Sequence, residues 1–526
     1  MGPRTAVGVT WRQLRLSTAV MTSLVVAMVA LGVASYDLSG GAPAMVGTLA
    51  LVRNPAFRAL YGNFSTLDTA GAFVLWKLGL VVTLAVALWG ALAATRVTRG
   101  AEDVGTWDLL VTGTAGRGAI VGQSMAVLAV MGVAVGTAVF ATFALSGQRL
   151  ADSALYGAGV VGLVWCAQAV GVAAAQVLAP RRSASQGALA VVGVAYLARM
   201  VADASTNGAW LRDATPFGWL ENLGAFQRAE PIWLVALLVG PALAVTALLP
   251  LARRRDVGLA QWTRSDRAAA RSGLLRTPWR FAWRELASTI AVWLIVTAVV
   301  GLVIGYLTNA LVVFSRGDPS LGRLLARWHL ALLASVHGFV GEIGATLAFG
   351  ISFFVVSAVA TVGGDVSAGR LDLPLGYGAG RRSWLAATVV ATAGATVLIA
   401  LVTASATWIG VGAGGSSLAF GAALGAMLNA ISIAPLVLGA TALAVSLAPR
   451  VAQVVLAALL AVSYLTAVLG PAMHWPRLIV EASLYHYVRL VPAEAPNWRA
   501  TVVFAVLGAA AFAGGLSRFR RADLVA

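Results

Sequence analysis

The sequence is poor in charged residues. Only 11% of its 526 residues are Asp, Glu, Lys or Arg, against about 25% in a soluble globular domain. At the same time 60% of the residues are hydrophobic, and the mean hydropathy is +0.86. This composition excludes a large soluble domain. It predicts an all-α integral membrane protein, because a spanning helix needs roughly 20 mostly apolar residues.

Lysine and cysteine are almost absent. Lys77 is the single lysine, and it lies in an apolar run rather than in the P-loop motif that places a lysine on nucleotide phosphates. The chain therefore cannot hydrolyse ATP by that route. Cys166 is the single cysteine, so disulfides and C-x-x-C sites are excluded. Motifs such as H-E-x-x-H and G-x-S-x-G are missing as well. We expect no catalytic residue, and no cofactor or metal bound by this chain.

Twelve hydrophobic runs are long enough to cross a bilayer. They lie at about 17–36, 71–95, 119–146, 154–178, 187–203, 231–251, 286–309, 344–363, 385–411, 419–447, 451–470 and 500–516. With both termini in the cytoplasm, the cytoplasmic segments carry 24 arginines, twice as many as the rest of the chain. This bias follows the positive-inside rule for a plasma-membrane protein. The net charge of +17 is then an orientation signal, and we expect no nucleic-acid partner.

The chain is an internal duplication, which determines the architecture. Four motifs of the first half recur in the same order in the second, at offsets of 264 to 272 residues. The first motif, Trp11-Arg12-Gln13-Leu14, recurs as Trp283-Arg284-Glu285-Leu286, and the second, Gly105, Asp108, Gly116 and Arg117, recurs as Gly369, Asp372, Gly380 and Arg381. The third, Leu178-Ala179-Pro180-Arg181, recurs as Leu447-Ala448-Pro449-Arg450. The fourth, Arg253–Asp256, is loosely matched by Arg520–Asp523. The sequence predicts two six-span halves, 1–252 and 285–526, joined by a cytoplasmic arginine-rich linker at 253–284.

The predicted spans hold few ionisable residues. Almost all of the 20 acidic residues fall in loops or at span ends, whereas ion-coupled carriers place carboxylates inside the membrane. Lys77 lies well inside a span, where it either snorkels to the interface or contacts substrate. The energy for transport should therefore come from a partner. An ion-coupled carrier or a membrane enzyme acting alone is the competing interpretation.

The cytoplasmic loop between the second and third spans is the most informative segment. Residues 96–117 combine the acidic pair Glu102 and Asp103 with Trp107 and Leu110. A short helix that presents Trp107 and Leu110, with solvent-facing carboxylates beside them, can dock into a groove of a partner. An ordinary solvated loop is the alternative. Recurrence of the pattern at 365–382 favours docking.

This pattern resembles the coupling helix of ABC-2-type permeases, the membrane subunits of ATP-binding-cassette exporters. The fused twelve-span form, with Thr215–Leu220 before the sixth span, is similar to the actinobacterial exporters of polyketide antibiotics such as tetronasin. The resemblance implies two copies of a separate ATPase subunit, which bind ATP and Mg and drive closure of the spans. It assigns the coupling role to Glu102, Asp103, Gly105, Asp108, Leu109, Leu110 and Arg117, with Trp107 beside them, and to Gly369, Asp372 and Arg381 in the second copy.

The second copy departs from the pattern. Val366 and Ser367 replace the acidic pair, and Pro374 stands opposite Leu110. Proline interrupts a helix interior at a cost of about 3 kcal/mol. We therefore expect the first loop to bear more of the contact with the ATPase.

The external segments predict interfacial helices and carry all four histidines. In residues 320–337 the apolar side chains fall on one face of a predicted helix, namely Leu321, Leu324, Leu325, Trp328 and Leu332. The corresponding segment of the first half, 51–67, is expected to form a similar interfacial helix. His329, His337, His474 and His486 match no zinc motif, so interfacial packing is favoured over a metal site. Aromatic residues at Phe217, Trp219, Tyr485 and Tyr487 suit an interfacial belt, with an outer gate as the lesser alternative.

The spans are rich in glycine and alanine and poor in polar residues, which suits close helix packing. A path between the halves would meet mainly apolar side chains. We expect efflux of hydrophobic small molecules, such as antibiotics and other drugs of a polyketide-like kind. Membrane lipids are expected around the protein. Export of lipid or cell-envelope precursors by the same architecture is the alternative.

Overall fold

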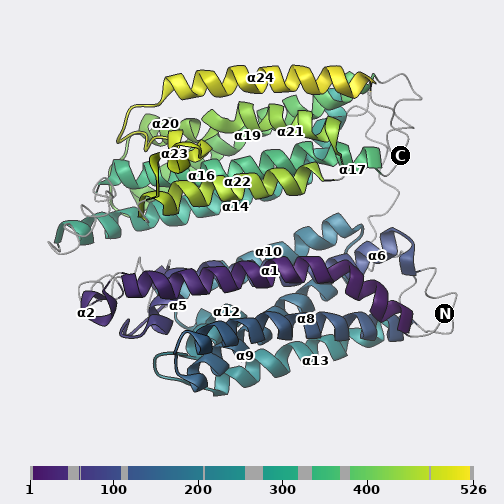
Figure 1. Cartoon of the computed structure of the whole chain (residues 1–526), viewed down its shortest axis with the longest axis vertical. Coiled ribbons are helices and arrows are strands. Elements are labelled where there is room, and N and C mark those ends of the chain that lie inside the picture. Colours follow the sequence, from purple (N-terminus) through teal and green to yellow (C-terminus); the bar gives the residue numbers. More distant parts are fainter. Residues whose placement is uncertain are drawn as a thin grey trace. The chain divides into compact units, whose positions relative to one another are not determined.

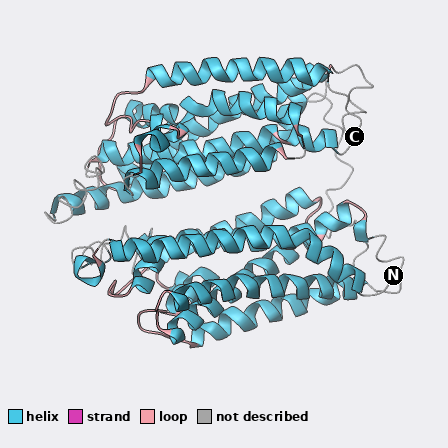
Figure 2. Ribbon diagram, viewed as in Figure 1, coloured by secondary structure: helices cyan, strands magenta, loops and turns pink. Residues whose placement is uncertain are grey.

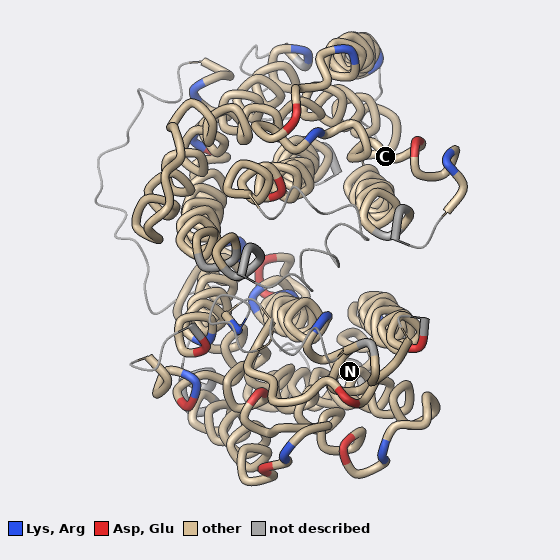
Figure 3. Tube along the Cα trace, turned by 90° about the vertical axis from the view of Figure 1, so that its left-hand side faces the viewer, with Lys and Arg blue, Asp and Glu red and all other residues tan. Residues whose placement is uncertain are grey.

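The computed structural model describes residues 4–38, 40–45, 52, 58–59, 61–107, 117–204, 208–254, 277–317, 335–367, 380–449, 451–472 and 475–521. Every element with described bounds is a helix (Figures 1 and 2). Charged residues are sparse along the traced chain (Figure 3). The chain divides into two compact units, Met1–Arg267 and Ala268–Ala526.

Unit 1 is a bundle of long helices with short helices at its ends. Its helices are α1 (Arg4–Leu38), α2 (Gly41–Met45), α5 (Ala70–Val97), α6 (Arg99–Asp103), α8 (Arg117–Leu145), α9 (Leu150–Val177), α10 (Arg181–Ala204), α11 (Trp210–Asp213), α12 (Pro216–Asn222) and α13 (Ile232–Arg254).

Unit 2 repeats this succession of long helices. It contains α14 (Pro278–Gly317), α16 (Val336–Val359), α17 (Thr361–Ser367), α19 (Arg381–Ala413), α20 (Phe420–Ala430), η4 (Ile431–Ile433), α21 (Ala434–Leu447), α22 (Ala452–Ala472), α23 (Arg477–Glu481), η5 (Leu484–Tyr487) and α24 (Trp498–Arg521). α13 and α14 both extend into the predicted linker 253–284, so the ends of that segment are helical.

The helices confirm an all-α integral membrane protein. Within the described residues, ten helices are long and apolar enough to cross a membrane. The remaining two predicted spans correspond to shorter apolar helices, Ile232–Leu248 and Ala452–Val468. A total of twelve spans therefore stays a prediction.

The same order of neighbours recurs in both units. In unit 1, α9 packs against α5, α8, α10 and α13. In unit 2, the broken helix α20–α21 packs against the counterparts α16, α19, α22 and α24. Small residues allow these contacts, since backbones approach closely only where side chains are absent. A Cβ atom at Gly508 of α24, for example, would lie 2.2 Å from the carbonyl oxygen of Pro435.

Candidate coupling segment and polar cavity

The predicted coupling segment begins with α6, at the end of unit 1 where α1 starts (Figure 1). α6 follows α5 after a break at Thr98, whose hydroxyl donates to the carbonyl of Ala94 at 2.6 Å. It then packs on the first residues of α10. A Cβ atom at Gly100 would lie 2.7 Å from Cδ of Arg181. The absence of a side chain at Gly100 therefore lets α6 lie directly against the start of α10.

Two ion pairs hold α6 internally. Arg99 Nη1 lies 2.9 Å from Glu102 Oε2 and Arg99 Nε lies 3.3 Å from Asp103 Oδ1, because the i, i+3 and i, i+4 spacings place these side chains on one face. The side chains of Arg99 and Glu102 are only 3% and 1% exposed. Asp103 is 30% exposed and accepts a 2.7 Å hydrogen bond from the backbone N–H of Arg181. The expectation of two solvent-facing carboxylates is therefore wrong for Glu102.

Trp107 is also turned into the bundle. Gly105 has a φ of +72°, a left-handed conformation that glycine adopts without strain, and the chain turns there before Trp107. The Trp107 side chain is 4% exposed. It belongs to an apolar cluster with Ala6 of α1, Ala101 of α6, and Ile120 and Val121 of α8. The expectation that Trp107 is presented outward is wrong, because it anchors the segment to α1 and α8.

The other predicted coupling residues are only partly placed. Arg117 and Arg381 begin α8 and α19. Asp108, Leu109, Leu110, Gly369 and Asp372 lie outside the described residues. The coupling role of the whole set therefore stays a prediction.

The repeated motifs meet within each unit. In unit 1, α6 packs against Arg181 of the Leu178–Arg181 motif. In unit 2, a Cβ atom at Gly363 of α17 would lie 2.8 Å from the carbonyl oxygen of Pro449, in the matching motif. The segment after the second long helix thus lies against the start of the fifth in both units, a contact that the sequence repeat did not reveal.

A buried charge cluster lies at the opposite end of α10. Arg199 Nη1 lies 3.1 Å from Asp203 Oδ2 and 3.4 Å from Glu221 Oε2. Arg212 donates to Asp203 Oδ1 from Nε at 2.9 Å and from Nη2 at 2.6 Å. Arg199 and Asp203 are 2% and 1% exposed. The sequence placed Asp203 only at a span boundary, although its i, i+4 spacing from Arg199 was a signal for this pair.

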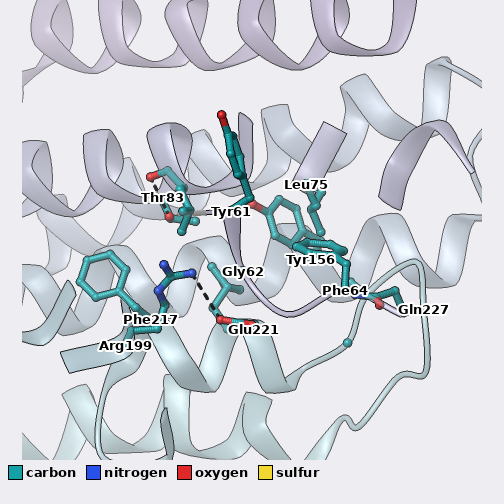
Figure 4. A pocket seen from close by; sticks show the side chains of 15 residues that line it. Tyr61, Gly62, Phe64, Leu75, Thr83, Tyr156, Arg199, Phe217, Glu221 and Gln227 are labelled. Atoms are coloured by element: carbon teal, nitrogen blue, oxygen red, sulfur yellow. Dashed lines mark hydrogen bonds and ion pairs between the residues drawn. The ribbon is translucent and has the colours of Figure 1, made fainter. Parts of the chain in front are cut away.

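Arg199 and Glu221 of this cluster line a cavity of about 50 Å³ (Figure 4). Its walls come from α5, α9, α10 and α12 and from the loops at 61–64 and 224–227. Glu221 accepts a hydrogen bond from the backbone N–H of Asn63, and Gln227 Oε1 accepts two from Ser65, at 2.6 Å from its N–H and 2.9 Å from its hydroxyl. These bonds fasten the loop 61–65 beside the cavity.

Aromatic packing is found at η5 of unit 2. Tyr485 lies 5.4 Å from Tyr464 and 5.9 Å from Phe349, measured between ring centroids. Burial raises the pKa of Tyr485 to about 12, so its hydroxyl stays protonated near neutral pH. Tyr485 and Phe217 are 6% and 5% exposed, and both therefore serve packing within their units.

The external segments offer no metal site in what the structure describes. His337 and His486 are described, whereas His329 and His474 are not. Among the described side chains no group of three or more His, Cys, Asp or Glu could hold a metal ion. The predicted interfacial segment 320–337 lies almost entirely outside the described residues, whereas residues 52, 58–59 and 61–67 of the segment 51–67 are described.

The fold thus defines a multi-pass membrane protein, and comparisons with known proteins point to one class. Residues 275–520 match the family model described as the C-terminal domain of the multidrug efflux system permease Rv1217c. The chain is also 29% identical, over 267 residues, to the multidrug efflux system permease protein Rv1217c of Mycobacterium tuberculosis. That alignment covers 50% of this chain and 47% of the relative, so the match spans about half the length of each. Both comparisons support the resemblance to permeases. The tetronasin-type subfamily stays a prediction.

Proposed function

We propose that this chain is the membrane permease subunit of an ATP-binding-cassette exporter in the plasma membrane. It forms the path for efflux of hydrophobic small molecules, and two copies of a separate ATPase subunit supply the energy. The observation that carries the proposal is the match of residues 275–520 to an efflux permease family model. The end of unit 1 that holds α6 then faces the cytoplasm, together with both termini.

The charge cluster of unit 1 is a set of paired side chains at the end of α10 opposite α6. Each of its carboxylates has an arginine partner, with Asp203 between Arg199 and Arg212 and Glu221 on Arg199. These ion pairs join α10 to the short helices α11 and α12.

The contacts of α6 suggest how force from the ATPase reaches the spans. α6 packs on α5 and α10, and the Trp107 cluster joins it to α1 and α8. A partner that pushes this segment therefore moves four long helices together, since coupling travels through packed contacts. With Glu102 and Trp107 buried, Asp103 and the 81%-exposed Val104 are the described residues of the segment most open to the partner.

Reconstitution tests the proposal directly. The chain is placed in proteoliposomes with and without a purified ATPase subunit, and release of a neutral hydrophobic dye is followed after ATP addition. We expect dye export only with both subunits and ATP, and none with a hydrolysis-deficient ATPase as the control. Export by this chain alone under a proton gradient would establish the ion-coupled alternative. ATP-dependent movement of labelled lipid without dye export would establish the lipid alternative.

A further inference from the structure

The cavity of unit 1 combines apolar walls with hydrogen-bonding groups. Aromatic rings of Phe64 and Phe217 and aliphatic side chains of α5 line it. Tyr156 of α9 lines it too and is only 4% exposed. The Tyr156 hydroxyl forms no hydrogen bond with another described residue, although its ring packs edge-on against Phe143. Buried hydroxyls normally find a partner, so this one is available to a bound molecule.

Thr83 of α5 brings a second hydroxyl to the lining of the cavity. Thr83 donates to the carbonyl of Leu80 at 3.1 Å, which leaves the Thr83 oxygen as an acceptor. Figure 4 shows Thr83, Tyr156 and Arg199 around the same space. The cavity therefore offers a hydrogen-bond donor, the Tyr156 hydroxyl, and an acceptor, the Thr83 oxygen, within an otherwise apolar lining.

The charged residues that line the cavity, Arg199 and Glu221, select against ionic ligands because they pair with each other at 3.4 Å. Arg199 also pairs with Asp203, at 3.1 Å. The guanidinium of Arg199 is further occupied by a 2.7 Å hydrogen bond to the carbonyl of Ala59. A charged ligand would be desolvated here without an unpaired counter-charge, which is costly.

The volume limits what enters. Drug-sized ligands need pockets of roughly 300–1,000 Å³, several times the 50 Å³ available. Only one end of a larger molecule fits. We propose that this cavity binds the hydroxyl- or carbonyl-bearing end of a neutral amphipathic molecule, whose apolar remainder lies along the outside of α5. The proposal rests on the proposed export function only in taking this molecule as cargo.

Gly79 of α5 allows the cavity to be filled without disturbing the backbone. It lines the cavity, and the nearest atom to a Cβ built there is Leu75 Cβ, at 3.7 Å. Gly79→Leu thus projects into the cavity, and Tyr156→Phe removes one hydroxyl. Gly193→Leu is the matched control, because Gly193 is also helical but lies outside the cavity with nothing within 4 Å of its Cβ position.

The test measures binding to the full chain in lipid nanodiscs, without ATPase. Three labelled probes each carry a ten-carbon chain: 1-monodecanoylglycerol, decyltrimethylammonium and decyl sulfate. Binding to protein-free nanodiscs is subtracted. We expect saturable binding of monodecanoylglycerol that Gly79→Leu abolishes, that Tyr156→Phe weakens about fivefold, as for one neutral hydrogen bond, and that Gly193→Leu leaves unchanged.

Several results would overturn the proposal. Absence of saturable binding, or equal binding in the wild type and Gly79→Leu, would refute the proposal that this cavity is a binding site. Equal affinity for the three probes would refute the proposal that the site prefers neutral molecules. If ATP-dependent dye export occurs without saturable probe binding, the site is wrong and the proposed function stands. If probe binding is saturable and sensitive to Gly79→Leu but no export occurs, the site stands and the proposed function is wrong.

Discussion

Replacement of Glu102 by alanine should destabilise the fold rather than merely weaken a partner contact. The Glu102 carboxylate lies 2.9 Å from Arg99, and the two side chains are 1% and 3% exposed. Removing one partner of a buried ion pair costs about 3–5 kcal/mol, because the other charge stays buried without compensation. Asp103 still lies 3.3 Å from Arg99 Nε. We therefore expect a loss at the lower end of that range, about 3 kcal/mol.

Thermal unfolding of the purified chain in detergent measures the effect. The control is Asp103→Ala, whose side chain is 30% exposed. This change removes one backbone hydrogen bond to a carboxylate, worth about 1.5 kcal/mol, and one of the two ion pairs of Arg99 while leaving Glu102 beside that arginine. The double variant Arg99→Met with Glu102→Leu should recover most of the lost stability, since apolar replacements of buried pairs are often neutral. If Glu102→Ala leaves the unfolding temperature unchanged and reduces only ATPase binding, Glu102 faces the partner and the reasoning is refuted.

Three other predictions concern coupling, packing and assembly. Asp103→Ala should weaken capture of the ATPase subunit in pull-downs and lower substrate-stimulated ATP hydrolysis. Both effects should be larger than those of Asp372→Ala, because the second loop lacks the acidic pair. An equal or larger effect of Asp372→Ala would contradict asymmetric coupling. Gly508→Leu should lower the unfolding temperature strongly, since its Cβ would lie 2.2 Å from the carbonyl of Pro435, whereas Gly514→Leu meets its nearest atom at 3.7 Å and should be tolerated. Native mass spectrometry should find one permease chain with two ATPase subunits, and a complex that requires two permease chains would contradict the fused-half interpretation.

Composition and periodicity were sufficient to predict the class of the fold. Long apolar runs with few charges dictate spanning helices, because a backbone in lipid must satisfy its hydrogen bonds within the helix. The helices lie where those runs were predicted, including the two shorter ones at 232–248 and 452–468. The motif repeat did not predict which segments touch, although α6 and α17 each meet the Leu-Ala-Pro-Arg motif of their own unit.

Tertiary structure alone decided which charged and aromatic residues face inward. The sequence around Glu102 and Trp107 suited an exposed docking helix equally well, because a polar loop shows no periodicity that distinguishes its faces. Burial depends on what packs against the loop, namely α8 and two elements remote in sequence, α1 and the start of α10. The cavity depends likewise on distant segments, since Tyr156 and Arg199 meet only when α9 and α10 pack. Local pattern determines helices, whereas sites arise from side chains that long-range packing brings together.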